Sequence, residues 1–333
     1  MGIDLPLIWA IIIAFAVMMY VVMDGFDLGI GILFPFFPET RDRDVMMNSV
    51  APIWDGNETW MVLGGAGLFG AFPLAYSVIL PALYLPLILM LIALIFRGIA
   101  FEFRFKSNRT KPWWDRAFAW GSLLATFIQG AALGAFIQGF KVVERGYAGG
   151  PFDWVSPFAI FCGLALVGGY AMLGCGWLIW KTEGDLQKRM YRLMPRIGLG
   201  VALCIAIVSL WTPIAFPKIS ERWFGPNIYF LWPVPALVLA CVVLLIRAVR
   251  SKRELQPFVL TLALFILSYL GLAISLWPNV VPPAITIWDA SSPPESQGFL
   301  LVGMLFLIPI ILVYTAYSYY VFRGKVDEDG YHH

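Results

Sequence analysis

Two short acidic motifs lie next to long apolar runs in the first 60 residues of the chain. The motif DGFDLG ends the first run and contains Asp24 and Asp27, and the motif WDGNETW opens the second run and contains Asp55 and Glu58. Each pair is spaced i, i+3, so on a helix both carboxyl groups of a pair project from one face. Because carboxyl groups exchange protons and bind cations, these four acids indicate a path for protons or other cations.

A structural role is the alternative interpretation of these acids. They could be interfacial groups or helix caps, and Asp55 is placed to cap the second helix. A charge at the centre of a bilayer costs about 2.5–3.5 kcal/mol, less toward the interface. Asp24 and Asp27 on one apolar helix therefore need partners or water. Arg97, at the end of the third apolar run, is a candidate counter-charge.

The composition of the chain is that of an integral membrane protein. The residues are 60% apolar and 13% charged, and the mean hydropathy is +0.79. Soluble domains are about half apolar and a quarter charged. A net charge of +2, with Lys and Arg spread along the chain, gives no indication of nucleic-acid binding. The start, MGIDLP, lacks the basic region of a signal peptide, so the first apolar run is expected to stay as a helix.

Apolar runs separated by charged breaks predict an all-α membrane protein with about nine transmembrane helices. The links are short, which predicts one polytopic membrane domain over residues 1–333 without a soluble domain. The expected helices lie near residues 6–30, 52–72, 77–98, 117–138, 157–180, 197–216, 228–248, 256–277 and 298–321.

Basic residues predict how the helices are oriented. Nineteen of the 23 Lys and Arg residues lie in the C-terminal tail or at the links that follow the first, third, fifth and seventh helices. Cytoplasmic loops carry an excess of these residues, so the N-terminus is predicted outside and the C-terminus in the cytoplasm. All four motif acids then lie at the cytoplasmic side. Asp42 and Asp44, in the link between the two motifs, are interpreted as solvated.

Residues that bind metals are scarce. The two histidines, His332 and His333, are the last two residues, so no interior imidazole can hold a haem or copper ion. The cysteines lie in apolar runs without CxxC spacing and are interpreted as small buried hydrophobic residues. They are Cys162, Cys175, Cys204 and Cys241. We expect that no metal or cofactor is ligated by this chain.

Three motifs together resemble one known family. DGFDLG at the end of the first predicted helix, WDGNETW at the start of the second and FRGIAFEFR at the end of the third are similar to subunit II of the cytochrome bd quinol oxidases. The cyanide-insensitive oxidases have a subunit II that is equally similar. The resemblance extends to the nine-helix layout, and its specific part is the first third of the chain.

The resemblance implies a heterodimer in the bacterial cytoplasmic membrane. Subunit I would carry haems b and d and oxidise quinol at the outer side, and oxygen would be reduced to water with cytoplasmic protons. A small accessory membrane subunit and membrane lipid are further partners that fit such a complex. The resemblance implies that Asp27 and Asp55 line the proton path, and Asp24, Asn57 and Glu58 belong to the same motifs.

Two other functions fit the same residues. A proton-coupled secondary transporter would also have many helices and a few intramembrane acids, and a non-catalytic scaffold would use the acids to hold a partner. Transporters often carry helix breaks at matching places in two halves. The segments WPVPALVL and FLIPIIL contain Pro, but they do not form a repeated break. Haem absorbance of a two-chain complex, or substrate uptake by a colourless single chain, would separate these functions.

Overall fold

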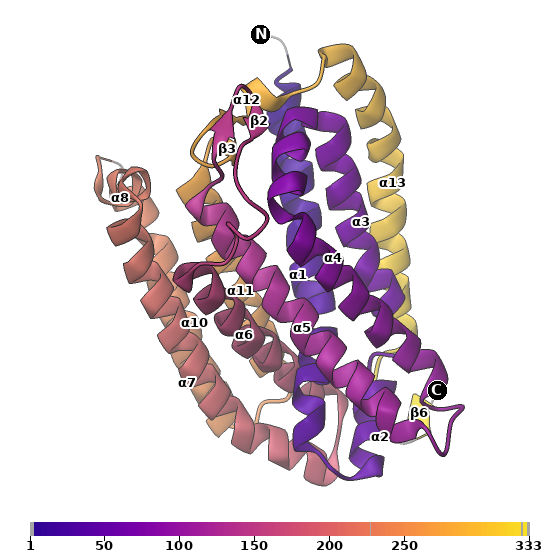
Figure 1. Ribbon diagram of the computed structural model, residues 1–333. Helices are drawn as coiled ribbons and strands as arrows, with labels where there is room; N and C mark the ends of the chain where they lie inside the picture. Colours follow the sequence, from indigo (N-terminus) through magenta and orange to yellow (C-terminus); the bar gives the residue numbers. More distant parts are fainter. Residues whose placement is uncertain (1–2, 227, 328, 332–333) are drawn as a thin grey trace.

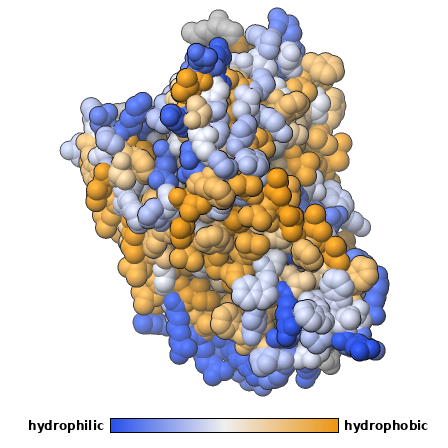
Figure 2. Space-filling view, viewed as in Figure 1, coloured by the Kyte–Doolittle hydropathy of each residue, from blue (hydrophilic) through white to orange (hydrophobic). Residues whose placement is uncertain are grey.

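A computed structural model describes residues 3–226, 228–327 and 329–331 as an all-α membrane protein. Long helices run side by side through the length of the molecule, and the two ends of the chain lie at opposite ends of the bundle (Figure 1). On the face shown in Figure 2, hydrophobic residues form a band across the middle, and hydrophilic residues gather at both ends. This distribution fits a protein that spans a bilayer.

Within the described ranges, eight segments are helical, long and apolar enough to cross a membrane. Two of them include a short neighbouring helix, η1 (Phe34–Phe36) after α1 and α9 (Ile228–Leu231) before α10. The eight long helices are α1 (Leu5–Leu33), α4 (Pro73–Phe103), α5 (Lys111–Gln138), α6 (Pro157–Lys181), α7 (Gly184–Ala215), α10 (Pro233–Arg250), α11 (Leu255–Leu276) and α13 (Pro294–Val321).

The second expected helix forms as α3 (Trp54–Ala71), which packs against α1 and α4. It is not one of the eight apolar helices, because its 18 residues include Asp55, Asn57 and Glu58 in the first two turns. The count of nine membrane crossings and the sides on which the termini lie therefore stay predictions.

Short elements connect the long helices at both ends of the bundle. The amphipathic helix α2 and the C-terminal hairpin β5–β6 lie at the lower end in Figure 1, and α12 and the hairpins β1–β2 and β3–β4 lie at the upper end. Their bounds are α2 (Thr40–Asn48), α8 (Pro217–Phe224), α12 (Ile287–Ala290), β1 (Val142–Val143), β2 (Gly146–Tyr147), β3 (Asn279–Val281), β4 (Ile285–Thr286), β5 (Val326–Asp327) and β6 (Gly330–Tyr331).

Close packing of α1 on α6 buries the C-terminal half of α1. A Cβ atom at Gly29 would lie 1.8 Å from the carbonyl oxygen of Tyr170, and one at Gly174 would lie 2.6 Å from the carbonyl carbon of Gly29. Only glycine permits so close an approach of two helix backbones. The turns of α1 that carry Asp24 and Asp27 are therefore enclosed by neighbouring helices.

The prediction that Asp42 and Asp44 are solvated is wrong. Their side chains are only 15% and 21% exposed, and both form ion pairs. Asp44 pairs with the fully buried Arg104, and Asp42 lies 3.0 Å from Arg189 on α7. These ion pairs connect α2 to the C-terminal end of α4 and to the first turns of α7. The polar sequence of this link did not predict that its acids have partners.

The cysteines occupy two environments. All four are free; Cys162 and Cys175 are buried as expected, but Cys204 and Cys241 are only half-buried. Within the part of the chain that the structure describes, no group of three or more His, Cys, Asp or Glu side chains is arranged to hold a metal ion. His332 and His333 lie outside the described residues.

Candidate functional site

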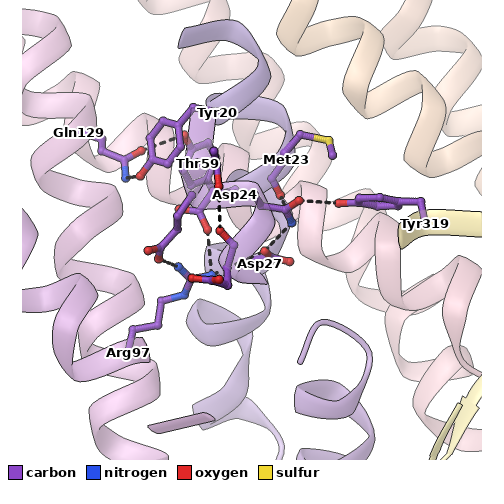
Figure 3. A network of polar contacts seen from close by, with 12 residues as sticks. Tyr20, Met23, Asp24, Asp27, Thr59, Arg97, Gln129 and Tyr319 are labelled. Carbon is purple, nitrogen blue, oxygen red and sulfur yellow. Dashed lines mark hydrogen bonds and ion pairs between the residues drawn. The ribbon is translucent and has the colours of Figure 1, made fainter. Parts of the chain in front are cut away.

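One buried arginine, Arg97, holds three carboxyl groups together (Figure 3). Arg97 on α4 is fully buried, and its Nη2 lies 2.8 Å from Asp24 Oδ1 and 3.7 Å from Asp27 Oδ2. Its Nη1 lies 2.6 Å from Glu58 Oε1. If all three acids were ionised, two negative charges would stay uncompensated in the interior. Because such a state is costly, the cluster favours holding at least one proton.

Three helices position these side chains. Asp24 and Asp27 project from one face of α1, Glu58 comes from the first turns of α3, and Arg97 lies near the end of α4. Two aromatic rings cover the guanidinium group, at 6.0 Å for Trp54 and 5.8 Å for Phe101, measured to the ring centroids. These rings are stacked on each other, and they keep the cation in place without adding a further charge.

The three acids differ in their access to solvent. Asp24 and Asp27 are completely buried, whereas the Glu58 side chain is 23% exposed. Asp24 Oδ2 and Asp27 Oδ1 have no hydrogen-bond partner among the described residues. A buried carboxylate oxygen without a donor is costly, and a proton on that oxygen removes the charge. The arrangement is therefore suited to acids that bind and release protons.

Asn57 connects Asp27 to a distant helix. Its Nδ2 donates to Asp27 Oδ2 at 2.8 Å and to the carbonyl oxygen of Met23 at 3.3 Å. Its Oδ1 accepts from the hydroxyl group of Tyr319 on α13 at 2.9 Å (Figure 3). Tyr319 was not predicted from the sequence, because it lies 262 residues from Asn57 and belongs to none of the three motifs.

A second group of polar side chains extends from the acids toward the middle of the bundle. Tyr20 lies one helical turn before Asp24 on α1, and its hydroxyl accepts from Gln129 Nε2 at 2.7 Å. Gln129 Oε1 in turn accepts from the Tyr170 hydroxyl at 2.9 Å. Tyr20 and Tyr170 are buried, so helices α1, α5 and α6 share one hydrogen-bonded chain beside the carboxyl cluster. None of these three residues was predicted from the sequence, because none lies in the three motifs.

Asp55 does not join the cluster around Arg97. It is exposed in the first turn of α3, one turn before Glu58. The alternative that Asp55 caps this helix is wrong, because Ile53 is the N-cap residue and no side chain caps the helix there. Four of the five polar residues that the two motifs supply therefore lie in the site, and Asp55 lies on the surface beside it. The four are Asp24, Asp27, Asn57 and Glu58.

Comparisons with known proteins agree over almost the whole chain. The family described as cytochrome bd terminal oxidase subunit II matches residues 5–322. Cytochrome bd-I ubiquinol oxidase subunit 2 of Escherichia coli (strain K12) is 30% identical over 98% of this chain and 96% of its own length. Cytochrome bd ubiquinol oxidase subunit 2 of Bacillus subtilis (strain 168) is 29% identical over 96% of both chains.

A solved structure has the same fold. The bd oxidase from Geobacillus thermodenitrificans contains a chain that aligns with a TM-score of 0.74. The alignment covers 93% of this chain and 97% of that chain, at 16% sequence identity. At this identity the structural likeness supports the arrangement of helices and no finer property.

Proposed function

This chain belongs to the cytochrome bd terminal oxidase subunit II family, and we propose that it is the haem-free subunit of a quinol:oxygen oxidoreductase. In this proposal it forms one polytopic domain in the bacterial cytoplasmic membrane and pairs with a subunit I. That partner holds haems b and d, oxidises quinol and reduces oxygen to water. The relatives' names, as second subunits of ubiquinol oxidases, support the pairing.

The contribution of this chain is a route by which protons reach the oxygen-reducing partner. The observation that carries this proposal is the graded exposure of the acids around Arg97. Asp55 is exposed, Glu58 is 23% exposed and contacts Arg97, and Asp24 and Asp27 are completely buried. Protons therefore have carboxyl groups available at the surface, at the edge of the bundle and in its interior.

Arg97 couples the buried acids to Glu58. When Glu58 takes up a proton, its carboxyl group becomes neutral and its attraction for the guanidinium weakens. The guanidinium can then pair more closely with Asp24 and Asp27, of which Asp27 is the more distant at 3.7 Å. Transfer of the proton to a buried acid restores the charge on Glu58. The guanidinium thus stays in the site and lowers the free-energy cost of moving a proton from one carboxyl group to another.

The direction of proton uptake gives the reaction an electrical consequence. If quinol protons leave outside and the protons consumed come from the cytoplasm, one charge crosses the membrane per electron. Each such charge is worth about 2.3 kcal/mol per 100 mV. This part of the proposal depends on the predicted orientation, in which the acids lie at the cytoplasmic side.

Substitution of single acids by their amides tests the proton route. Asn keeps the size of Asp but cannot exchange a proton, so Asp27→Asn and Asp55→Asn should leave the complex haem-loaded. Oxygen reduction per haem should fall by about 10²-fold or more, as for the loss of a proton-transfer group. Glu102→Gln is the control, because Glu102 is an exposed acid near the end of α4 whose ion pair is with the exposed Lys106.

The scaffold alternative gives the opposite result. If the acids only hold the structure, a neutral amide avoids the cost of burying a charge. Both assembly and turnover should then survive. Normal turnover per haem in both Asn variants would therefore remove the proton route from the proposed function.

A further inference from the structure

The hydrogen bonds of Asn57 fix which way its amide points. Nδ2 faces two groups that can only accept, the Asp27 carboxylate and the carbonyl oxygen of Met23. Oδ1 must therefore be the atom that faces Tyr319, and the Tyr319 hydroxyl must be the donor. In the reversed orientation, a carbonyl oxygen of the amide would face the Asp27 carboxylate. Asp27 and Met23 thus set the orientation of the amide, and the Tyr319 hydroxyl supplies the donor that Oδ1 needs in that orientation.

Tyr319 is itself held in place by ring contacts. Its ring packs edge-on against Phe26 at 6.5 Å and against Trp177 at 6.1 Å between centroids. Most of α13 is exposed, and Tyr314, Tyr317 and Tyr320 on this helix are about 60% exposed or more. Tyr319 thus connects a peripheral helix to the buried acids.

We propose that Tyr319 is a positioning residue for Asp27: its hydroxyl holds the Asn57 amide in the orientation in which the amide donates to the carboxylate. This inference rests on the proposed proton route. Tyr319 does not exchange the proton; it sets how readily Asp27 accepts and releases one. A carboxylate that keeps this donor is stabilised in its charged form.

A narrow crevice lies beside Asn57 and Tyr319. It is lined by α3 and α13, with Gly56, Asn57, Ser318 and Tyr319 among the lining residues. Its volume of about 10 Å³ is close to the minimum that accommodates one water molecule. The crevice thus reaches Asn57 and Tyr319, and the Asn57 amide separates it from the buried Asp27.

The test is the pH profile of oxygen reduction by the two-subunit complex carrying Tyr319→Phe. Phe keeps the ring that packs on Phe26 and Trp177 and removes only the hydroxyl, so haem content should not change. Without the hydroxyl, the Asn57 amide is held less firmly and its donation to Asp27 should weaken, which should shift the pH of half-maximal turnover upward, by about one pH unit if the donation is lost. Tyr317→Phe on the same helix is the matched control and should not shift the profile, because Tyr317 is 65% exposed.

A double variant tests whether Tyr319 acts through Asn57. Asn57→Ala should give a similar shift, and the double variant should shift no further than either single one. Additive shifts would overturn the proposal, as would a normal profile for Tyr319→Phe. Loss of the haem-loaded complex in Tyr319→Phe would overturn it too, because the hydroxyl would then be needed for the fold.

Failure of this inference is distinguishable from failure of the proton route. If Asp27→Asn turns over normally, the proton route is wrong whatever Tyr319 does. If Asp27→Asn is slow and Tyr319→Phe has the profile of the unchanged complex, only the positioning role is wrong.

Discussion

Removal of Arg97 should destabilise the protein severely. The side chain is fully buried, and its two terminal nitrogens lie 2.6, 2.8 and 3.7 Å from oxygens of Glu58, Asp24 and Asp27. Arg97→Ala leaves the two completely buried acids, and the partly exposed Glu58, without a cation. Loss of one partner of a buried ion pair costs about 3–5 kcal/mol. Truncation of this buried side chain adds the loss of its contacts with the rings of Trp54 and Phe101.

The free energy of unfolding in mixed micelles and the amount of haem-loaded complex measure this loss. Arg116→Ala is the control, because Arg116 is an exposed arginine that lies over the Trp113 ring. Arg97→Ala combined with Asp24→Asn removes the cation together with one of its buried acids. This double variant should regain about 1–3 kcal/mol relative to additive effects. A cost below about 1 kcal/mol for Arg97→Ala would refute the reasoning, because the acids would then need no counter-charge.

Two further predictions concern the ends of the bundle. With the predicted orientation, a membrane-impermeant thiol reagent applied outside should label Glu295→Cys and fail to label Asn108→Cys; the reverse pattern would overturn the placement of every acid. Hydrogen bonds from Lys325 and then Gln187 hold the pKa of Glu254 below its ordinary value of 4.5. The Lys325–Glu254 pair, which attaches the C-terminal hairpin to the start of α11, should therefore be intact above about pH 4.5. It should weaken as the pH falls through the lowered pKa of Glu254. The loss of stability should be small, because Glu254 is half exposed. Hydrogen exchange of the hairpin amides measures this change, and Glu254→Gln should remove its pH dependence.

The apolar runs predicted the membrane helices well, and polar helical segments were the main failure. The expected helix at 157–180 agrees with α6 (Pro157–Lys181) within a residue. The expected helix at 197–216 begins 13 residues late, because α7 starts at Gly184 with a charged stretch that has no continuous apolar run. Its buried residues Leu186, Met190 and Met194 are spaced i, i+4, i+8, which is the pattern of a helix with one apolar face. Helix α2 was missed for the same reason: its polar sequence has no apolar run, and it is held by ion pairs such as Asp44 with Arg104 and by the buried Met46 and Met47.

Spacing within a motif predicted part of the site, and long-range contacts could not be predicted. The i, i+3 spacing correctly put Asp24 and Asp27 on one face of a helix. The same spacing suggested that Asp55 and Glu58 act together, but two residues three apart point about 60° from each other. That angle leaves Asp55 in solvent while Glu58 reaches Arg97. No pattern near the motifs pointed to Tyr319, because its relation to Asn57 is created only by the packing of α13.

The charge pairing around Arg97 also has a consequence for the biosynthesis of the chain. Asp24 and Asp27 leave the ribosome about 70 residues before Arg97 and almost 300 residues before Tyr319. At 5–20 residues per second, Arg97 follows the acids after roughly 4–14 s and Tyr319 after roughly 15–60 s. We therefore expect the first helix to wait at the insertion machinery, with its acids neutral or hydrated, until α4 supplies the cation. A chain that stalls before α4 would keep unpaired acids in its membrane segment, which distinguishes an unfinished product from a complete one.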